Sequence, residues 1–271
     1  LFRSQFTMQT QKDLVSMHPR HGIMNIDVLS FARLAYRVFE ETGTKQMQVL
    51  DDEGKNLILR KIAGDYENKL TVLKGNIKKL GYISEVKSVI SEFTQYDIGE
   101  EEIDEMLDHL DEDSRLYYKL KDIRLLYEGF QDYLRERYIT KEELLDVLNS
   151  QVKESELLKN SVVVLDGFTG FTPVQNRLIL ELMRCCKEVW VTVTMDEREN
   201  PYAYKHPYQL FGLSKQMVTT LVRMAGEDHI EVEEPVCLYG YPVKRFEKNQ
   251  ELAFLERNIF RYGSGRYDKA V

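Results

Sequence analysis

The residues best placed to do chemistry lie in the segment SVVVLDGFTGFTPVQ, residues 161–175. Its apolar run from Val162 to Leu165 predicts a strand that is buried on both faces of a parallel sheet. Asp166 follows at the carboxyl end of that strand, where open α/β sheets bind their ligands. In nucleotide-hydrolysing sheets an aspartate at this position holds Mg²⁺. The pattern therefore indicates either such a metal-binding aspartate or an ordinary β–α turn that contains one.

The residues that follow predict the elements that hold this aspartate in place. Thr172 is expected to cap a helix that begins at Pro173, and Gln175 stands where a capping box has Glu or Gln. The segment EVWVTVT, residues 188–194, predicts the next strand, with Trp190 in the core. Strand, turn, helix and strand together form an α/β unit whose carboxyl edge carries the aspartate.

The start of the chain shows a similar alternation. We expect a helix over residues 11–17, a strand over residues 23–29 and a second helix over residues 31–41. Ser30 would cap that second helix, and Gly43 would end it at the C′ position. Near the end of the chain, we expect a helix at 209–224, a short strand at 230–233 and a last helix at 249–260.

The middle of the chain, residues 44–159, contains no convincing strand. Its apolar residues recur every three or four positions, which predicts amphipathic helices marked by Leu57, Ile58 and Ile62; by Val86, Val89, Ile90 and Phe93; by Ile103, Met106, Leu107 and Leu110; and by Leu116, Leu120, Ile123, Tyr127, Phe130 and Leu134. Between Glu100 and Asp113 there are many carboxylates and no Lys or Arg, which favours a solvated helix face. Thr140 and Glu143 have the spacing of a capping box for one further helix.

The composition limits the classes of function. The chain has 271 residues, a net charge of -8 and no apolar run that could span a membrane, so we expect no membrane partner. The charge disfavours a surface that binds nucleic acid as a whole but allows a local groove. Three cysteines, including adjacent Cys185 and Cys186, argue against a disulfide framework and favour a reduced, cytoplasmic setting. The sequence has no P-loop and no zinc spacing, so we expect no metal site and no catalytic residue in this chain.

The segment around Asp166 also resembles a known motif. Residues 166–175, DGFTGFTPVQ, resemble motif two of the UvrD-like helicases, whose pattern is Asp-Glu-Phe-Gln-Asp, four residues and Gln. The amino-acid sequence of this segment is similar to that of the B subunits of bacterial AddAB-type helicase-nucleases. Further similarity lies at residues 5–7 (QFT), 28–35 (VLSFARLA) and 251–256 (ELAFLE). These segments occur in the order of the family, so the resemblance covers essentially the whole chain.

The resemblance implies an architecture and a set of cofactors. The fold would be α/β, with a RecA-like, P-loop-NTPase-type parallel sheet core that an all-helical inserted subdomain interrupts. Residues 1–43 and 160–225 would form the two parts of the RecA-like domain, residues 44–159 the helical subdomain, and residues 226–271 a connecting segment toward a second RecA-like domain. ATP, Mg²⁺ and an iron–sulfur cluster would belong to a longer parent protein, and we expect no cofactor in this chain.

The chain departs from the family motif at positions that support ATP hydrolysis. Gly167 replaces the glutamate that activates the attacking water, and Thr169 replaces the glutamine of the motif. Asp166 and Gln175 remain. The resemblance therefore implies a degenerate Walker B motif. We expect the chain itself to be inactive, although the parent resembles a hydrolase.

The resemblance also implies contact with DNA. Gln5, Phe6, Thr7, Ser30 and Phe31 match positions that line the path of single-stranded DNA in active relatives. The alternative is structural, with both phenylalanines in the core and the serine only a helix cap.

Two hypotheses for the whole chain follow. The first is that it guides and scans single-stranded DNA in double-strand-break repair and recombination, beside an AddA-like partner subunit. The second is a non-catalytic scaffold that binds the partner helicase-nuclease subunit, which the acidic net charge favours.

Overall fold

The chain folds into helices and two small parallel sheets, in an α/β arrangement. The computed structural model describes residues 7–44, 48–77, 79–135, 137–240, 243–259, 263 and 266–267. In chain order the elements are α1 (Thr7–Met17), α2 (Phe31–Thr42), β1 (Gln48–Leu50), α3 (Asp52–Asp65), α4 (Leu80–Gln95), α5 (Glu100–Asp108), α6 (Arg115–Leu134), β2 (Tyr138–Thr140), α7 (Glu143–Gln151), η1 (Val152–Glu154), α8 (Glu156–Lys159), β3 (Val162–Leu165), α9 (Pro173–Cys185), β4 (Glu188–Val191), α10 (Gly212–Glu227), η2 (Lys244–Phe246) and α11 (Gln250–Asn258).

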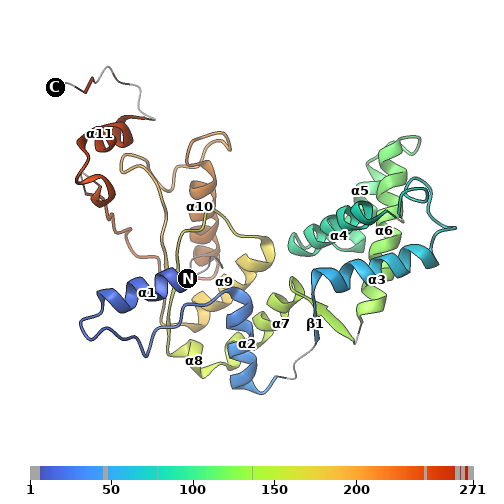
Figure 1. The fold of residues 1–271 in the computed structure, drawn as a ribbon, viewed down its shortest axis with the longest axis horizontal. Helices are drawn as coiled ribbons and strands as arrows, with labels where there is room; N and C mark the ends of the chain where they lie inside the picture. The colour runs from blue at the N-terminus through green and yellow to red at the C-terminus, as the bar shows by residue number, and fades with distance from the viewer. Residues whose placement is uncertain are drawn as a thin grey trace.

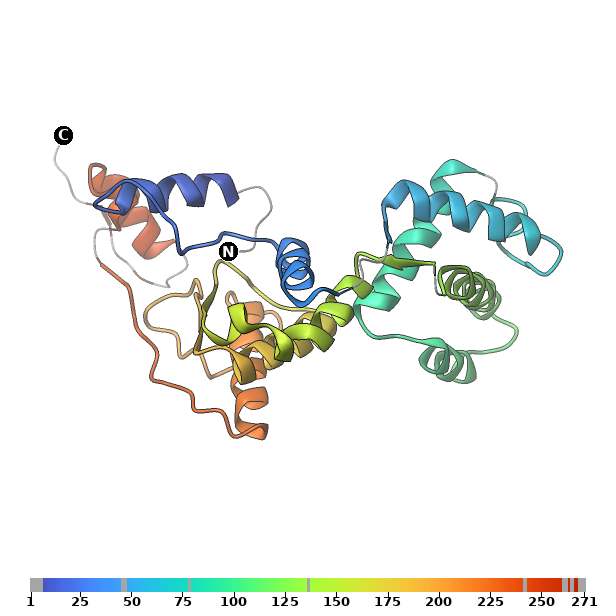
Figure 2. The ribbon, with the colours of Figure 1, turned by 90° about the horizontal axis from the view of Figure 1, so that it is seen from below.

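These elements gather into two lobes with a narrow connection between them (Figure 1). The helical lobe consists of α3, α4, α5 and α6, on the right of the figure. The α/β lobe contains α2, α7, α8, α9, α10 and the β3–β4 sheet, and the view turned by 90° keeps the two lobes apart (Figure 2). Within the described part of the chain, no helix is both long and apolar enough to cross a membrane.

The helical periodicities of the middle segment are confirmed as α3, α4, α5 and α6. Their apolar stripes pack into one cluster, whose buried members include Ile58, Ile62, Ile103, Leu126 and Phe130. The chain between α3 and α4 is held to this cluster by Asp122 of α6, which is only 2% exposed. The Asp122 carboxylate accepts hydrogen bonds from the backbone nitrogens of Thr71 at 2.9 Å and Leu73 at 2.8 Å. A buried carboxylate thus organises a segment that has no regular structure of its own.

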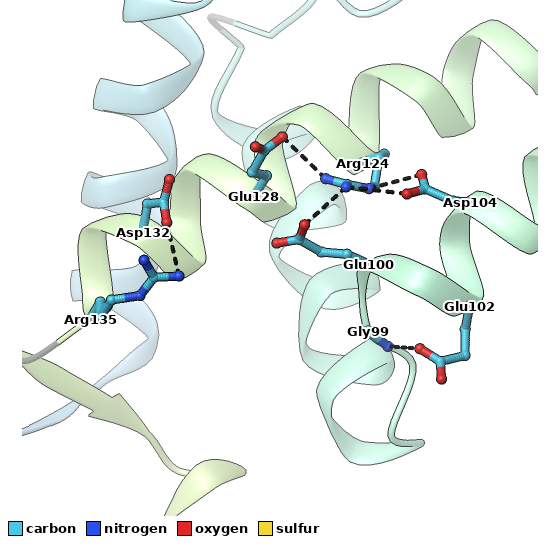
Figure 3. A network of polar contacts seen from close by, with 8 residues as sticks. All are labelled: Gly99, Glu100, Glu102, Asp104, Arg124, Glu128, Asp132 and Arg135. Atoms are coloured by element: carbon cyan, nitrogen blue, oxygen red, sulfur yellow. Dashed lines mark hydrogen bonds and ion pairs between the residues drawn. The ribbon is translucent and has the colours of Figure 1, made fainter.

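Charged residues join α5 to α6 at the surface (Figure 3). The Arg124 guanidinium contacts three carboxylates, at 2.9 Å for Glu100, 3.0 Å for Asp104 and 3.1 Å for Glu128. One arginine therefore neutralises part of the acidic face that the sequence predicts. The other carboxylates of α5 are exposed, as expected for a solvated helix face.

The α/β lobe is built around α9. One side of this helix packs with α2, α7 and α8, in a cluster that buries Leu34, Val38, Leu148, Leu178 and Leu182. The β3 and β4 strands pair in parallel, with Val162 opposite Glu188 and Leu165 opposite Val191. The predicted cap of α9 is confirmed, because Thr172 Oγ1 accepts from Gln175 N at 3.4 Å and Gln175 Oε1 accepts from Thr172 N at 3.0 Å.

The sheet is covered on one face only. Leu165 of β3 packs against residues of α9 and α10, whereas the side chains that point the other way are exposed. The exposed fraction is 51% for Val162, 41% for Val164 and 49% for Trp190. The prediction of a strand buried on both faces is therefore wrong, and so is the placement of Trp190 in the core. The physical reason is that the described residues provide a single layer of helices for a sheet of two strands.

Two other predicted strands do not form. Residues 23–29 and 230–233 are irregular, although the helices beside them are present as α1, α2 and α10. A strand is stable only beside a partner that pairs with its backbone, and no described strand lies next to either segment. The second strand of the sheet is also shorter than the predicted 188–194, since β4 ends at Val191.

The middle segment is not entirely helical, which corrects the predicted all-helical subdomain. It also contains β1 and β2, which pair in parallel with Val49 opposite Ile139 and Leu50 opposite Thr140. These strands pair with each other and do not join the β3–β4 sheet. The predicted domain ranges stay a prediction, because packing places α7 against α2 and α9 while the range 44–159 assigns it to the insert.

Candidate nucleic-acid interface

Asp166 lies at the carboxyl end of β3, where its carboxylate is oriented by the end of β4. The Thr192 hydroxyl donates a hydrogen bond to Asp166 and accepts one from the backbone nitrogen of Gly167 at 3.1 Å. Gly167 has a φ of 74°, a left-handed conformation that favours glycine. A glutamate at position 167 would be strained in this conformation, and the chain has glycine there. The turn therefore does not provide a base beside Asp166.

The turn after Asp166 carries an aromatic cluster that reaches α2. The rings of Phe31 and Phe168 lie 6.0 Å apart, and those of Phe168 and Phe171 lie 4.8 Å apart. All three rings are half-buried and pack against the small core under the sheet. The structure thus brings Phe31 to the edge that carries Asp166, as the sequence suggests.

The other predicted DNA-binding residues have different positions. Ser30 caps α2, because its Oγ accepts a hydrogen bond from Arg33 N at 3.3 Å, and its side chain is half-buried. Gln5 and Phe6 lie outside the described residues. Thr7 begins α1, and its side chain lies outside the described part as well. Their contact with DNA stays a prediction.

The exposed face of α2 carries residues that the sequence reasoning missed. A hollow of about 520 Å³ is lined by Leu29, Arg33, Tyr36, Arg37 and Glu40. The two arginines are one helical turn apart and exposed, and the exposed tyrosine lies between them. Arg37 lies 4.0 Å from the Asp27 carboxylate. In the sequence, these residues are recognisable as the polar positions on the face opposite the buried stripe of α2.

This face has the chemistry that single-stranded nucleic acid requires. Guanidinium groups bind backbone phosphates, and an exposed aromatic ring can stack on a base of any sequence. Arg33 and Arg37 share α2 with Phe31 but lie on the side of the helix opposite its buried stripe, so this face points away from the core. Cation and ring come from one helix, so the spacing of their backbone positions is fixed.

The described residues provide few ligands for a metal ion or an iron–sulfur cluster. They contain no group of three or more His, Cys, Asp or Glu side chains that could hold a metal ion. Asp166 alone fits Mg²⁺ only where nucleotide phosphates supply most of the ligands. An iron–sulfur cluster needs four thiolates, and the chain has three cysteines. Burial, with a smaller effect of Cys185, raises the pKa of the Cys186 thiol to about 12, so this residue stays protonated at neutral pH.

The comparisons with known proteins agree with one another. The family described as "ADDB, N-terminal" matches residues 4–256. The B subunit of the ATP-dependent helicase/deoxyribonuclease of Lachnoclostridium phytofermentans is 44% identical over 269 residues, which covers 97% of this chain and 23% of that protein. The proteins of the same name from Clostridium kluyveri and Clostridium acetobutylicum are 34% and 29% identical, over 100% and 98% of this chain.

The chain thus spans about 23% of the length of the curated relatives that it matches. The family match extends over nearly all of the chain and includes α2, the turn at Asp166 and α9. The chain therefore belongs to the AddB family, in the part that is described as N-terminal.

Proposed function

We propose that this chain is part of the helicase-like region of the B subunit of an ATP-dependent helicase/deoxyribonuclease, where it guides and scans single-stranded DNA in double-strand-break repair and recombination. It would act in the cytoplasm beside an AddA-like partner subunit. The name of the relatives and the family match support this proposal. The parallel β3–β4 pair, with an aspartate at its carboxyl end, supports a RecA-like core that further chain would complete.

The exposed face of α2 is the observation that carries the DNA-binding part. The chain is acidic overall, and α5 concentrates carboxylates on the helical lobe, so a nucleic acid would be repelled from most of the surface. Arg33 and Arg37 form a local exception beside an exposed ring. A strand that passes along α2 would gain phosphate contacts and a stacked base there.

The proposal includes a degenerate ATPase motif. Asp166 would help to hold Mg²⁺ on a nucleotide whose other ligands come from the longer protein. The backbone at Gly167 favours glycine, so the chain provides no side-chain base to activate water at that position. ATP turnover by the complex would then depend on other motor elements.

The test uses the full-length subunit in complex with its partner. The double variant R33Q/R37Q should weaken binding to single-stranded DNA and lower the slope of log K against log salt by about 1.4, because two phosphate contacts are lost. The matched control is R223Q, which removes an exposed arginine that pairs with Glu227 in α10, 2.7 Å away. Unchanged affinity and slope in a folded R33Q/R37Q complex would contradict the proposal.

The ring can be tested separately. Y36A should weaken binding by about 5- to 150-fold, which is the range for one stacked base, without changing the salt slope. If Y36A lowers the slope instead, the ring acts by positioning the arginines.

The acidic face of α5 favours the second function, a scaffold for the partner subunit. Exposed Glu101 and Glu105 do not contact Arg124, so E101K/E105K changes the face without breaking that network. If the scaffold is the main function, this variant should lose its partner on purification, and R33Q/R37Q should behave like the parent complex.

A further inference from the structure

The lobes are connected by the β1–β2 pair, which packs against a hydrophobic core on each of its two faces. Side chains of the β1–β2 pair alternate between its faces. Leu50 and Tyr138 pack on the core of the helical lobe, whereas Val49 and Ile139 pack on the core of the α/β lobe. The pair is only three residues long on each strand, so it fixes a point of attachment and leaves the relative angle of the lobes to other contacts.

A buried ion pair reinforces this point of attachment. The Lys55 ammonium of α3 lies 2.7 Å from the Glu142 carboxylate at the start of α7, and it also contacts Ser91 Oγ of α4 at 3.2 Å. The Lys55 side chain is 2% exposed and that of Glu142 is 11% exposed. Separation of a buried pair leaves an uncompensated charge, so this contact resists opening. Both residues lie within a few positions of the β1–β2 pair, which makes this region a pivot.

A second ionic contact lies away from the pivot and is exposed. Arg177 of α9 binds Asp97, which lies in the turn between α4 and α5, and so joins the α/β lobe to the helical lobe. The same guanidinium binds Asp146 of α7 within its own lobe, at 2.9 Å. The side chains of Arg177 and Asp97 are 39% and 61% exposed, so water and salt can reach the pair.

We propose that the helical lobe is a movable unit that pivots at the β1–β2 pair and is latched by the ion pair between Arg177 and Asp97. The buried contact keeps the lobes attached, and the exposed contact selects the angle seen in the structure. An exposed ion pair is weak, so the latch opens without the unfolding of either lobe. This inference goes beyond the proposed function and does not depend on it.

The two ion pairs of Arg177, with Asp97 and with Asp146, can be removed one at a time. D97N removes the charge that joins the lobes and leaves the arm to Asp146 in place. Asp97 has a φ of 62°, and asparagine tolerates this conformation well, so the backbone of the turn is retained. D146N is the matched control, because it removes the arm that stays within the α/β lobe.

The experiment measures the distance between the lobes in the full-length protein, in complex with its partner. A donor and an acceptor dye are placed at Glu105 of α5 and Lys187 after α9, which are both exposed. We expect D97N to at least double the population with a changed dye-to-dye distance, and high salt to do the same in the parent but to add little in D97N. D146N should leave the distribution unchanged. A D97N distribution equal to that of the parent, or an equal effect of D146N, would overturn the proposal.

Discussion

The helical lobe and the α/β lobe bury their apolar residues in different ways. The core of the helical lobe comes from one continuous part of the chain, from Leu50 to Leu134. The core beside α9 joins residues of α2 to residues more than a hundred positions later, across the helical lobe. The first lobe can form from local contacts, whereas the second needs distant segments to meet. The two lobes should therefore differ in how each responds to a local defect.

The largest expected effect is on the helical lobe alone. D122A removes a buried carboxylate and leaves the backbone nitrogens of Thr71 and Leu73 without their acceptor. Leu73 is buried and Thr71 is exposed, so one buried donor is left unsatisfied and a second bond to a charged acceptor is lost, which should destabilise this lobe by about 2–4 kcal/mol. Hydrogen exchange should show lost protection in α3 and α6, while α9 keeps the protection of the parent protein.

The control for this variant is D132A. Asp132 is exposed and makes a 3.3 Å ion pair with Arg135, the residue directly after α6 (Figure 3), so its loss should cost less than about 0.5 kcal/mol. If D122A lowers protection in α9 as much as in α6, the lobes unfold as one unit and the comparison fails.

The difference between the lobes also explains what the sequence could predict. Helical periodicity and caps are local, so α3 to α6 and the caps at Ser30 and Thr172 were predictable from neighbouring residues. Strands depend on distant partners. The predicted strand at residues 23–29 has no described neighbour and does not form, whereas β1 and β2 pair across the helical lobe and were missed.

The candidate site follows the same rule. Asp166 could be placed at a strand end because the strand, turn and cap are adjacent in sequence. Its contact with Thr192 and the contact of Phe31 with Phe168 depend on the tertiary fold. The exposed face of α2 could not be singled out from the sequence, because polar residues opposite a buried stripe are typical of any amphipathic surface helix.

An intermediate effect is expected at the pivot, where both lobes meet. Burial alone would raise the pKa of Glu142, but the hydrogen bond and charge of Lys55 outweigh it and hold this pKa below 4.5. A group with a lowered folded pKa stabilises the protein above its unfolded pKa and loses that contribution as the pH falls through the folded value. The stability conferred by Glu142 should therefore be full at neutral pH and decline below about pH 4.5.

Denaturant unfolding at several pH values measures this contribution. E142Q should lower stability at pH 7 and flatten the acid side of the stability profile, because the glutamine does not titrate. E101Q is the control, since Glu101 is exposed and lies within one lobe. An E142Q profile parallel to that of the parent protein below pH 5 would show that the pair with Lys55 does not couple the two lobes to pH.

The smallest effect should come from the open face of the sheet, and its value lies in a matched pair of substitutions. Val163 and Val164 are neighbours in β3 that point to opposite faces. Val163 packs against both apolar clusters of the α/β lobe, whereas Val164 is 41% exposed beside Trp190.

Threonine keeps the shape of valine and its preference for strands but adds a hydroxyl group. V163T should destabilise this lobe by about 1–2 kcal/mol, because the hydroxyl is added to a partly buried, apolar contact, and V164T by less than about 0.5 kcal/mol. Denaturant unfolding of the 271-residue chain compares the two variants under the same conditions. Equal losses would mean that the outer face of the sheet is also covered in solution, and the α/β lobe would then be as closed as the helical lobe.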